Sequence, residues 1–343
     1  MNTTVPAVSV VVPCRNEKRY IRQFVDSMLS QEPPPGGFEL IIADGRSTDG
    51  TREMLTQMSA VNSLIRVIDN PGRIVSTGLN GAILVARGDI IIRADVHTEY
   101  APDYICQCVT ALNKTGAVNV GGPWVACGRG YLDGAIAAAF HSRFGSGGAL
   151  AHDPDYEGVV DTVYLGCWRR EYLRAIGGFD EQLVRNQDDE LNLRSRRAGD
   201  VVWQTPRIQS RYYPRASLMR LFTQYMQYGY WKVLVIRKHR LPASWRHLMP
   251  AAFVSALTVL AVSSLLWRSA TVAFYAVIIA YGACAVMASA VTAARSELRF
   301  LPVLPVVFSC FHIGYGYGFL RGAIDFLVLR RAPTSHMSAL TRS

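Results

Sequence analysis

Acidic side chains are almost absent from the second part of this 343-residue sequence. Residues 207–343 contain 16 Lys and Arg but only two acidic residues, Glu297 and Asp325, so their formal net charge is +14, whereas residues 1–206 carry a net charge of −4. This asymmetry predicts that the two parts lie in different surroundings. Because 50% of the residues are apolar, the composition excludes a disordered chain.

Cysteines are few and dispersed, which excludes a small disulfide scaffold. Only Cys106 and Cys108 of the seven lie close together, and the number is odd. A Cys-x-Cys pair without a second cluster or a nearby His is weak evidence for a metal site, so we expect reduced cysteines that pack in the interior.

Charged residues are missing altogether from long runs near the C-terminus. Residues 248–267 and 269–294 are uncharged and mainly apolar, and a bilayer core takes about 20 such residues per helix. A third uncharged run, residues 300–320, predicts a third span, although prolines and glycines interrupt it. We therefore expect a membrane region over residues 248–331, followed by a tail at 332–343.

The N-terminal part lacks an apolar run that is long enough for a signal-peptide core, since residues 8–12 are too short. Residues 1–240 are therefore expected in the cytosol. Basic residues directly before the first predicted span agree with this orientation by the positive-inside rule; they are Arg237, Lys238, Arg240 and Arg246.

Three β-branched, apolar segments, each followed by a loop or a helical pattern, predict an α/β fold with a mainly parallel sheet. They are residues 8–12, 39–43 and 89–94. Ligands bind at the carboxyl ends of the strands in such sheets. Polar side chains that follow the three segments are Arg15, Asn16 and Glu17, then Asp44, then Asp95 and His97.

Two of these strand ends suggest specific ligands. Asp44 and Ser47 can hydrogen-bond a flat heterocycle or a ribose, although a plain capped turn through Ser47 or Asp49 explains the same residues. Asp95 and His97 are one residue apart, and this pair suits Mn²⁺ or Mg²⁺ bound to a diphosphate. A solvated loop is the alternative for that pair.

Three adjacent carboxylates, Asp188, Asp189 and Glu190, follow Gln187. Their mutual repulsion raises the proton affinity of at least one of them, which is useful for a general base. Acidic residues are also favoured at a helix N-terminus, with basic residues further along, and both interpretations can hold together.

The segments, in this order, resemble the GT-A-fold glycosyltransferases of family 2, over about residues 6–215. The similarity is greatest to bacterial succinoglycan-type exopolysaccharide glucosyltransferases. The matching stretches are residues 8–17, 44–51, 95–97, 177–181, 186–192, 211–215 and 227–232, together with the membrane-spanning tail.

The resemblance implies a role for each site residue. The loop with Pro13, Arg15, Asn16 and Glu17 would hold the uridine together with Asp44 and Ser47, and Asp95 with His97 would bind the metal and the diphosphate. Asp188 would be the catalytic base, with Gln187, Asp189 and Glu190 on the acceptor side. Two residues depart from the family pattern, namely Gln187 in place of Glu and His97 in place of Asp. The Gln-x-x-Arg-Trp motif of processive enzymes is absent, which implies addition of one sugar per encounter.

We therefore expect an inverting hexosyltransferase in the bacterial inner membrane, with a GT-A domain at residues 1–206 in the cytoplasm. It would move a hexose, glucose first, from a UDP-sugar to a lipid-diphosphate-linked saccharide, beside other polysaccharide-assembly proteins. The alternative, for which only Gln187 argues, is a catalytically silent nucleotide-binding or scaffold protein at the membrane.

Between the predicted domain and the first span, residues 207–247 interleave basic and aromatic side chains. Such a stretch can bind nucleic acid, but directly before a membrane span an interfacial amphipathic segment explains it better. We expect its aromatic rings at headgroup depth, its cations near anionic lipid, and no nucleic-acid partner.

Overall fold

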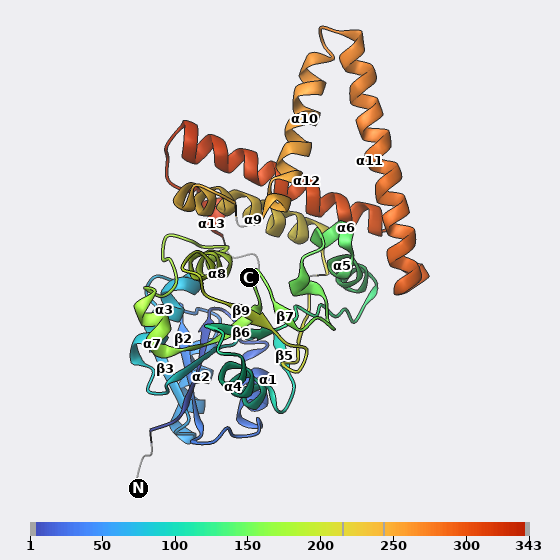
Figure 1. Cartoon of the computed structure of the whole chain (residues 1–343). Coiled ribbons are helices and arrows are strands. Elements are labelled where there is room, and N and C mark those ends of the chain that lie inside the picture. The colour runs from blue at the N-terminus through green and yellow to red at the C-terminus, as the bar shows by residue number, and fades with distance from the viewer. Residues whose placement is uncertain (1–4, 215, 243, 340–343) are drawn as a thin grey trace. The chain divides into compact units, whose positions relative to one another are not determined.

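The computed structural model describes residues 5–214, 216–242 and 244–339, which fold into two compact units (Figure 1). The first unit contains residues 5–125 and 150–212, and the second contains residues 126–149 and the described chain from residue 213 onward. The predicted boundary at residue 206 therefore needs correction. The first unit continues to Tyr212, and an internal segment, Ala126–Ala149, belongs to the second unit.

A mainly parallel sheet forms the centre of the first unit, as the sequence predicts. Its strand order is β3-β2-β1-β4-β8-β6-β9-β7, and β8 and β7 run antiparallel to their neighbours. Pro13 lies inside β1 and does not end it, since Pro13 pairs with Ala43 of β2. The strands are β1 (Val8–Cys14), β2 (Phe38–Asp44), β3 (Ile65–Asp69), β4 (Ile90–Arg93), β6 (Asn119–Gly122), β7 (Gly158–Val159), β8 (Tyr164–Arg169) and β9 (Val202–Gln204).

Helices cover both faces of this sheet because successive strand residues point to opposite sides. Val10 and Val12 of β1 pack with α1, α2 and α4, whereas Val11 packs with α3, α7 and α8. Burial on both faces explains why β1 and β2 are continuous apolar runs. The helices are α1 (Ile21–Leu29), α2 (Thr51–Val61), α3 (Val75–Val85), α4 (Tyr104–Thr115), α7 (Arg170–Ala175) and α8 (Gln187–Arg197).

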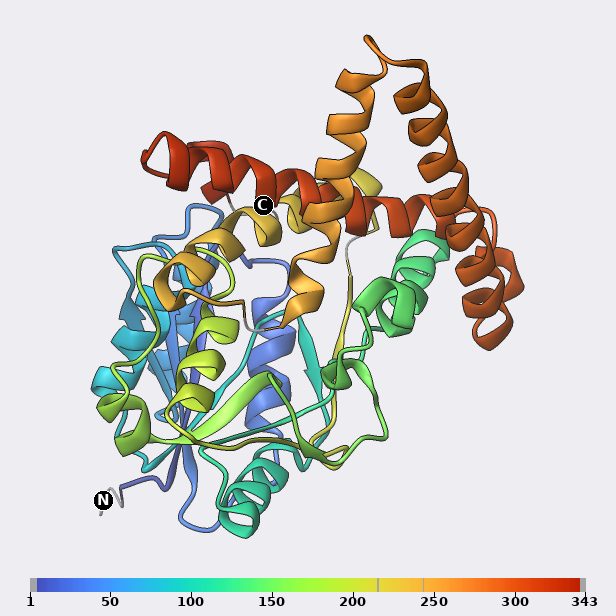
Figure 2. The same ribbon diagram turned by 45° about the horizontal axis from the view of Figure 1, so that its top comes forward.

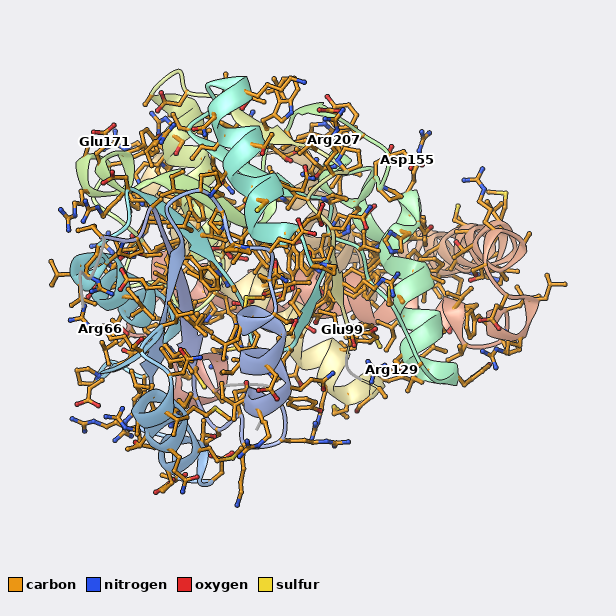
Figure 3. The ribbon with its side chains drawn as sticks, turned by 90° about the horizontal axis from the view of Figure 1, so that it is seen from below. Arg66, Glu99, Arg129, Asp155, Glu171 and Arg207 are labelled. Atoms are coloured by element: carbon orange, nitrogen blue, oxygen red, sulfur yellow. The ribbon has the colours of Figure 1, made fainter. Side chains whose placement is uncertain are left out.

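A separate antiparallel ribbon joins β5 (Thr98–Tyr100) to β10 (Ser210–Tyr212). Glu99 of β5, labelled in Figure 3, lies opposite Arg211 of β10, so opposite charges face each other across the ribbon. Because β5 begins directly after His97, the ribbon fixes one end of the loop that follows β4.

The second unit is helical, and glycines bring two of its helices close together. Helices α9 and α12 lie side by side (Figure 2). A Cβ atom on Gly229 of α9 would come within 2.0 Å of the carbonyl oxygen of Tyr315 in α12. The helices are α5 (Tyr131–His141), α6 (Arg143–Ser146), α9 (Leu218–His239), α10 (Met249–Ser263), α11 (Arg268–Arg295), α12 (Leu304–Ala323) and α13 (Ser335–Ser338), with a π-helical turn at Ile324–Val328.

Within the described residues, two helical stretches are long and apolar enough to cross a membrane, Trp245–Ser263 and Arg268–Arg295. They match the first two predicted spans, and their apolar windows are only 6% buried in protein. The third predicted span, at 300–320, forms α12, which buries Phe308 and Phe311 inside the second unit and is not one of the two candidates. The three predicted spans thus reduce to two candidate helices.

Aromatic residues expected at headgroup depth are instead buried inside the second unit. Tyr230 and Trp231 are 0% and 1% exposed. The Tyr230 hydroxyl donates to Oδ2 of Asp325 (3.0 Å), and Nε1 of Trp231 donates to the carbonyl of Met337 (2.9 Å). The interfacial prediction for residues 207–247 is therefore wrong for these two side chains, which fix the C-terminal segment to α9.

Candidate active site

The loops after β1 and β2 are joined by the side chain of Ser47. Asp44 ends β2 and is 2% exposed. Its Oδ1 accepts a 2.6 Å hydrogen bond from Oγ of Ser47, and that Oγ accepts one from the backbone N–H of Asn16 (2.9 Å). The structure thus brings three predicted nucleotide-binding residues, Asn16, Asp44 and Ser47, into one network.

Further bonds hold the two loops together. Oδ1 of Asn16 accepts from the N–H of Thr48 (2.9 Å), and the N–H of Glu17 donates to Oγ1 of Thr51 (2.8 Å). Asp49 accepts from the N–H groups of Lys18 and Thr51. Burial would raise the pKa of Asp49, but hydrogen bonds from the Thr51 hydroxyl and from these N–H groups outweigh it and lower the pKa. Asp49 therefore fits the capped-turn interpretation, whereas Asp44 lies at the carboxyl end of β2, where ligands bind in sheets of this kind.

Arg15 packs over the start of the second loop. A Cβ on Gly45 would lie 3.2 Å from the Arg15 side chain, so the absence of a side chain at Gly45 leaves room for it. Nε of Arg15 is buried and makes no hydrogen bond to a described residue. A buried donor without a protein partner suits a ligand that supplies an oxygen.

Asp95 follows β4, and its backbone is fixed by Tyr100. The N–H of Asp95 donates to the Tyr100 hydroxyl (2.7 Å), which in turn donates to the carbonyl of Asp95 (3.0 Å). Because Tyr100 is 8% exposed and packs in the apolar core, it positions Asp95 firmly. The Asp95 side chain itself is 31% exposed.

His97 lies against Glu17, a pairing that the sequence did not predict. Nε2 of His97 is 2.5 Å from Oε1 of Glu17, and the ring of Tyr20 packs edge-on against the imidazole at 5.0 Å. Glu17 was predicted to contact the nucleotide. The structure places it as the partner of a predicted metal ligand.

The first turn of α8 carries the three consecutive acids, and they have different surroundings. Glu190 is fully buried and forms an i,i+4 ion pair with Arg194 (3.0 Å). Arg194 also donates to the carbonyl of Gly178 (2.6 Å), so the pair anchors α8 to the preceding loop. Glu190 is thus explained as structural. Gln187, at the start of the helix, is 7% exposed.

Arg93 connects the end of β4 with α8, and sequence reasoning missed its importance. Its side chain is 6% exposed. The guanidinium donates to both carboxylate oxygens of Asp95 at 3.3 Å and, through Nη1, to Oδ1 of Asp188. The available signal was a single Arg in an otherwise apolar strand, since a buried charge requires partners. The predicted metal ligand and the predicted base therefore share one buried cation.

This arrangement shifts the proton affinities of both partners. Burial raises the pKa of Asp188 above that of an ordinary aspartate; Arg93 opposes the rise, and Asp95 and Asp189 add to it. Burial alone would lower the pKa of Arg93, but the two carboxylates outweigh it and raise the pKa. Arg93 is thus a permanent cation, and Asp188 is a carboxylate with increased basicity.

Asp95 and His97 fit a divalent cation in part. The described residues contain no group of three or more His, Cys, Asp and Glu side chains that could hold a metal. A carboxylate and an imidazole suit Mn²⁺ or Mg²⁺ when the donor diphosphate supplies further oxygens. The Glu17 carboxylate beside His97 also matches the common arrangement in which an acidic group orients a metal-binding imidazole.

Curated relatives resemble the chain over nearly its whole length. The succinoglycan biosynthesis protein ExoA of Rhizobium meliloti (strain 1021) is 32% identical over 321 residues, covering 92% of this chain and 95% of that protein. The dolichyl N-acetyl-alpha-D-glucosaminyl phosphate 3-beta-D-2,3-diacetamido-2,3-dideoxy-beta-D-glucuronosyltransferase of Methanococcus voltae is 25% identical and covers 92% of this chain and 97% of that protein.

Solved structures share the architecture. The mannosyltransferase PcManGT from Pyrobaculum calidifontis, solved in complex with GDP-Man and Mn²⁺, matches with a TM-score of 0.61 at 19% identity, over 90% of this chain and 86% of that one. The fold is therefore GT-A. The model of the family described as glycosyl transferase family 2 matches residues 9–173. Together with the relative from Rhizobium meliloti, this match shows that the chain belongs to glycosyl transferase family 2.

Proposed function

We propose that this protein is a membrane-anchored, inverting glycosyltransferase that moves a hexose from a UDP-sugar to a hydroxyl of a lipid-diphosphate-linked saccharide. Glucose is the first hexose to test. The observation that carries the proposal is the meeting of Asp95 and Asp188 on the guanidinium of Arg93. Asp95, a candidate ligand of the donor diphosphate, and Asp188, the candidate base, are thus held close together, as a direct displacement requires.

The nucleoside would bind over the joined loops after β1 and β2. Asp44 would offer a carboxylate acceptor for uracil or ribose, and the Ser47 hydroxyl, which donates to Asp44, would hold that carboxylate in place. The backbone at Pro13 and Asn16 lines the same edge of the sheet. The buried Nε of Arg15 would donate to an oxygen of the ligand.

Asp95 and His97 would hold Mn²⁺ or Mg²⁺ against the donor diphosphate, with Glu17 orienting the imidazole. A bound divalent cation neutralises the charge that develops on the departing diphosphate. We expect Asp95→Ala to abolish the stimulation of transfer by Mn²⁺. Metal titration curves of this variant that overlay those of the parent would refute the assignment.

Asp188 would act as the general base. Its carboxylate takes the proton of the acceptor hydroxyl while that oxygen forms a bond to the anomeric carbon, and the bond from this carbon to the diphosphate oxygen breaks on the opposite face. UDP departs, and the configuration at the anomeric carbon inverts. Gln187 and Asp189 flank the base on the acceptor side, and Glu190 supports α8 through Arg194.

The candidate spans and the relatives support the proposed acceptor and location. Two apolar helices, Trp245–Ser263 and Arg268–Arg295, would anchor the chain in the bacterial inner membrane, with the catalytic unit in the cytoplasm. Succinoglycan biosynthesis in the name of one relative and a dolichyl phosphate in that of another support exopolysaccharide synthesis on a lipid-linked acceptor. Membrane lipid and other polysaccharide-assembly proteins are then natural partners.

The test uses purified protein with UDP-glucose, Mn²⁺ and a lipid-diphosphate-linked saccharide. We expect release of UDP and a product whose anomeric configuration, measured by NMR, is opposite to that of the donor. Retention of configuration would refute the displacement mechanism. Gln187 is the argument for the alternative, a silent scaffold. Such a protein would bind UDP but would not cleave any UDP-hexose, so no UDP would be released.

A further inference from the structure

Arg93 occupies an unusual place for a permanent cation. It is 5% exposed, ends a strand that is otherwise apolar, and contacts Asp95 on one side and Asp188 on the other. A guanidinium is a planar fork that can bond two carboxylates at once, which a lysine cannot do with the same geometry. The two carboxylates come from distant parts of the sequence, so Arg93 sets their spacing.

The contacts with the two carboxylates are unequal. Asp95 lies at 3.3–3.4 Å from Nε and Nη2, which is long for a charge-assisted bond, and the third nitrogen, Nη1, contacts Oδ1 of Asp188. The Asp95 side chain is 31% exposed and that of Asp188 is 33% exposed, so both carboxylates can be approached from solvent. Arg93 thus holds Asp95 only through long contacts, and solvent gives a second cation access to this carboxylate.

A cation beside Asp95 opposes the binding of a second cation. Like charges near one carboxylate repel each other, and the repulsion is strong where water is largely excluded. Any divalent metal that binds Asp95 therefore competes with Arg93 for that carboxylate. When a metal ion occupies Asp95, the guanidinium of Arg93 keeps only its contact with Asp188.

We propose that Arg93 is a positioning residue that fixes the carboxylate of Asp188 and competes with the divalent metal for Asp95. The inference rests on the proposed function, because it assumes that Asp188 is the base and that Asp95 binds metal. Arg93 then makes opposite contributions to the two sites. It favours proton transfer and weakens metal binding.

These opposite contributions give Arg93→Gln a distinctive signature. We expect kcat to fall by about 10²-fold, since misplacement of a catalytic group by about 1 Å has such an effect. We expect Mn²⁺ to bind at least about fivefold more tightly, because a nearby positive charge is gone. Binding is measured in the presence of UDP by the EPR signal of free Mn²⁺, independently of turnover. If Arg93 merely supported the fold, its replacement would lower both kcat and the affinity for Mn²⁺.

Two further variants make the test decisive. Arg93→Lys keeps the charge but loses the fork, so kcat should fall while Mn²⁺ affinity stays within about twofold of the parent. In an Asp188→Asn background, Arg93→Gln should lower kcat by a much smaller factor than it does in the parent, because Arg93 acts through Asp188. The gain in Mn²⁺ affinity should persist in that background.

The matched control is Arg170→Gln. Arg170 forms an ion pair with Asp89 (3.0 Å), which lies directly before β4, at the end of the strand opposite to Arg93. The Arg170→Gln variant should have the kcat and the Mn²⁺ affinity of the parent.

Weaker or unchanged Mn²⁺ binding in Arg93→Gln, or parental kcat in Arg93→Lys, would overturn the proposal. If Arg93→Gln does not fold, Arg93→Lys decides by the same two measurements. Failure of the proposed function itself is recognised separately, because the parent would then show no transfer while its Mn²⁺ binding can still be measured.

Discussion

Gly229 of α9 and Tyr315 of α12 lie so close that a Cβ on the glycine would meet the tyrosine carbonyl oxygen at 2.0 Å. Gly229→Ala should therefore push the two helices apart and cost about 1–3 kcal/mol, as overpacking of an interior does. A lower Tm of the detergent-solubilised protein would be the sign. Gly282→Ala in α11 is the control, because a Cβ there meets nothing within 4 Å, and it should leave Tm unchanged or slightly raised. Equal Tm values for the two variants would contradict the close packing.

Asp188→Asn keeps the shape of the side chain and removes its basicity. Transfer should fall by roughly 10²- to 10⁴-fold, the range for a lost general base, while the affinity for the donor changes little. Asp189→Asn is the matched control and should cost far less. Steady-state kinetics with saturating donor measure both. An exchange of the two outcomes would assign the base to Asp189.

The pH dependence of transfer should report the raised pKa of Asp188. A base acts only when it is deprotonated, and a raised pKa means that the carboxyl keeps its proton to a higher pH than an ordinary aspartate. The rate should therefore rise through this pKa as the pH increases and level off above it. The residual activity of Asp188→Asn should lack this acid limb. A limb at or below the ordinary value for aspartate would contradict the assignment.

Asp44→Ala should weaken the binding of UDP by about 10- to 100-fold, because a buried charged acceptor and the order of Ser47 are both lost. Isothermal titration calorimetry with UDP measures the change. Asp69→Ala is a close control, since Asp69 also ends a strand and also contacts Arg52, but its side chain is 77% exposed. Its affinity for UDP should stay within about twofold of the parent, and a similar loss in both variants would point to Arg52.

The membrane orientation can be tested by cysteine labelling in intact cells, after the native cysteines are replaced. Trp267→Cys lies in the turn between the two candidate spans and should react with an impermeant reagent from outside. Val61→Cys, at the end of α2 and 87% exposed, should react only after the cells are opened. The reverse pattern would invert the proposed topology.

Much of the first unit could be predicted because its strands are buried on both faces and therefore stand out as apolar runs. The polar residues at the ends of β1, β2 and β4 converge as expected, since parallel strands end at one edge. The contact of Arg93 with Asp188 could not be predicted, because it joins positions 95 residues apart and depends on how α8 packs. Local sequence patterns cannot indicate a contact between residues that are so far apart in the sequence.

The second unit was predicted less well for a related reason. Hydropathy alone does not distinguish lipid from protein as the apolar neighbour of a helix, so α12 resembled a span. Its glycines were the contrary signal, because each leaves room for a close neighbour; a Cβ on Gly318 would lie 1.9 Å from the carbonyl of Met226. The segment Ala126–Ala149 carried no signal of its own that assigns it to the second unit.

The membership of this segment in the second unit affects the order in which the protein can fold. Phe140 of α5 packs against Phe311 of α12 with ring centroids 5.3 Å apart, and 170 residues separate the two in the chain. At about 5–20 residues per second, α5 waits roughly 10–35 s for this partner. Until then the apolar face of α5 lacks the neighbour that covers it in the folded protein, so the second unit can complete its packing only after α12 has been made.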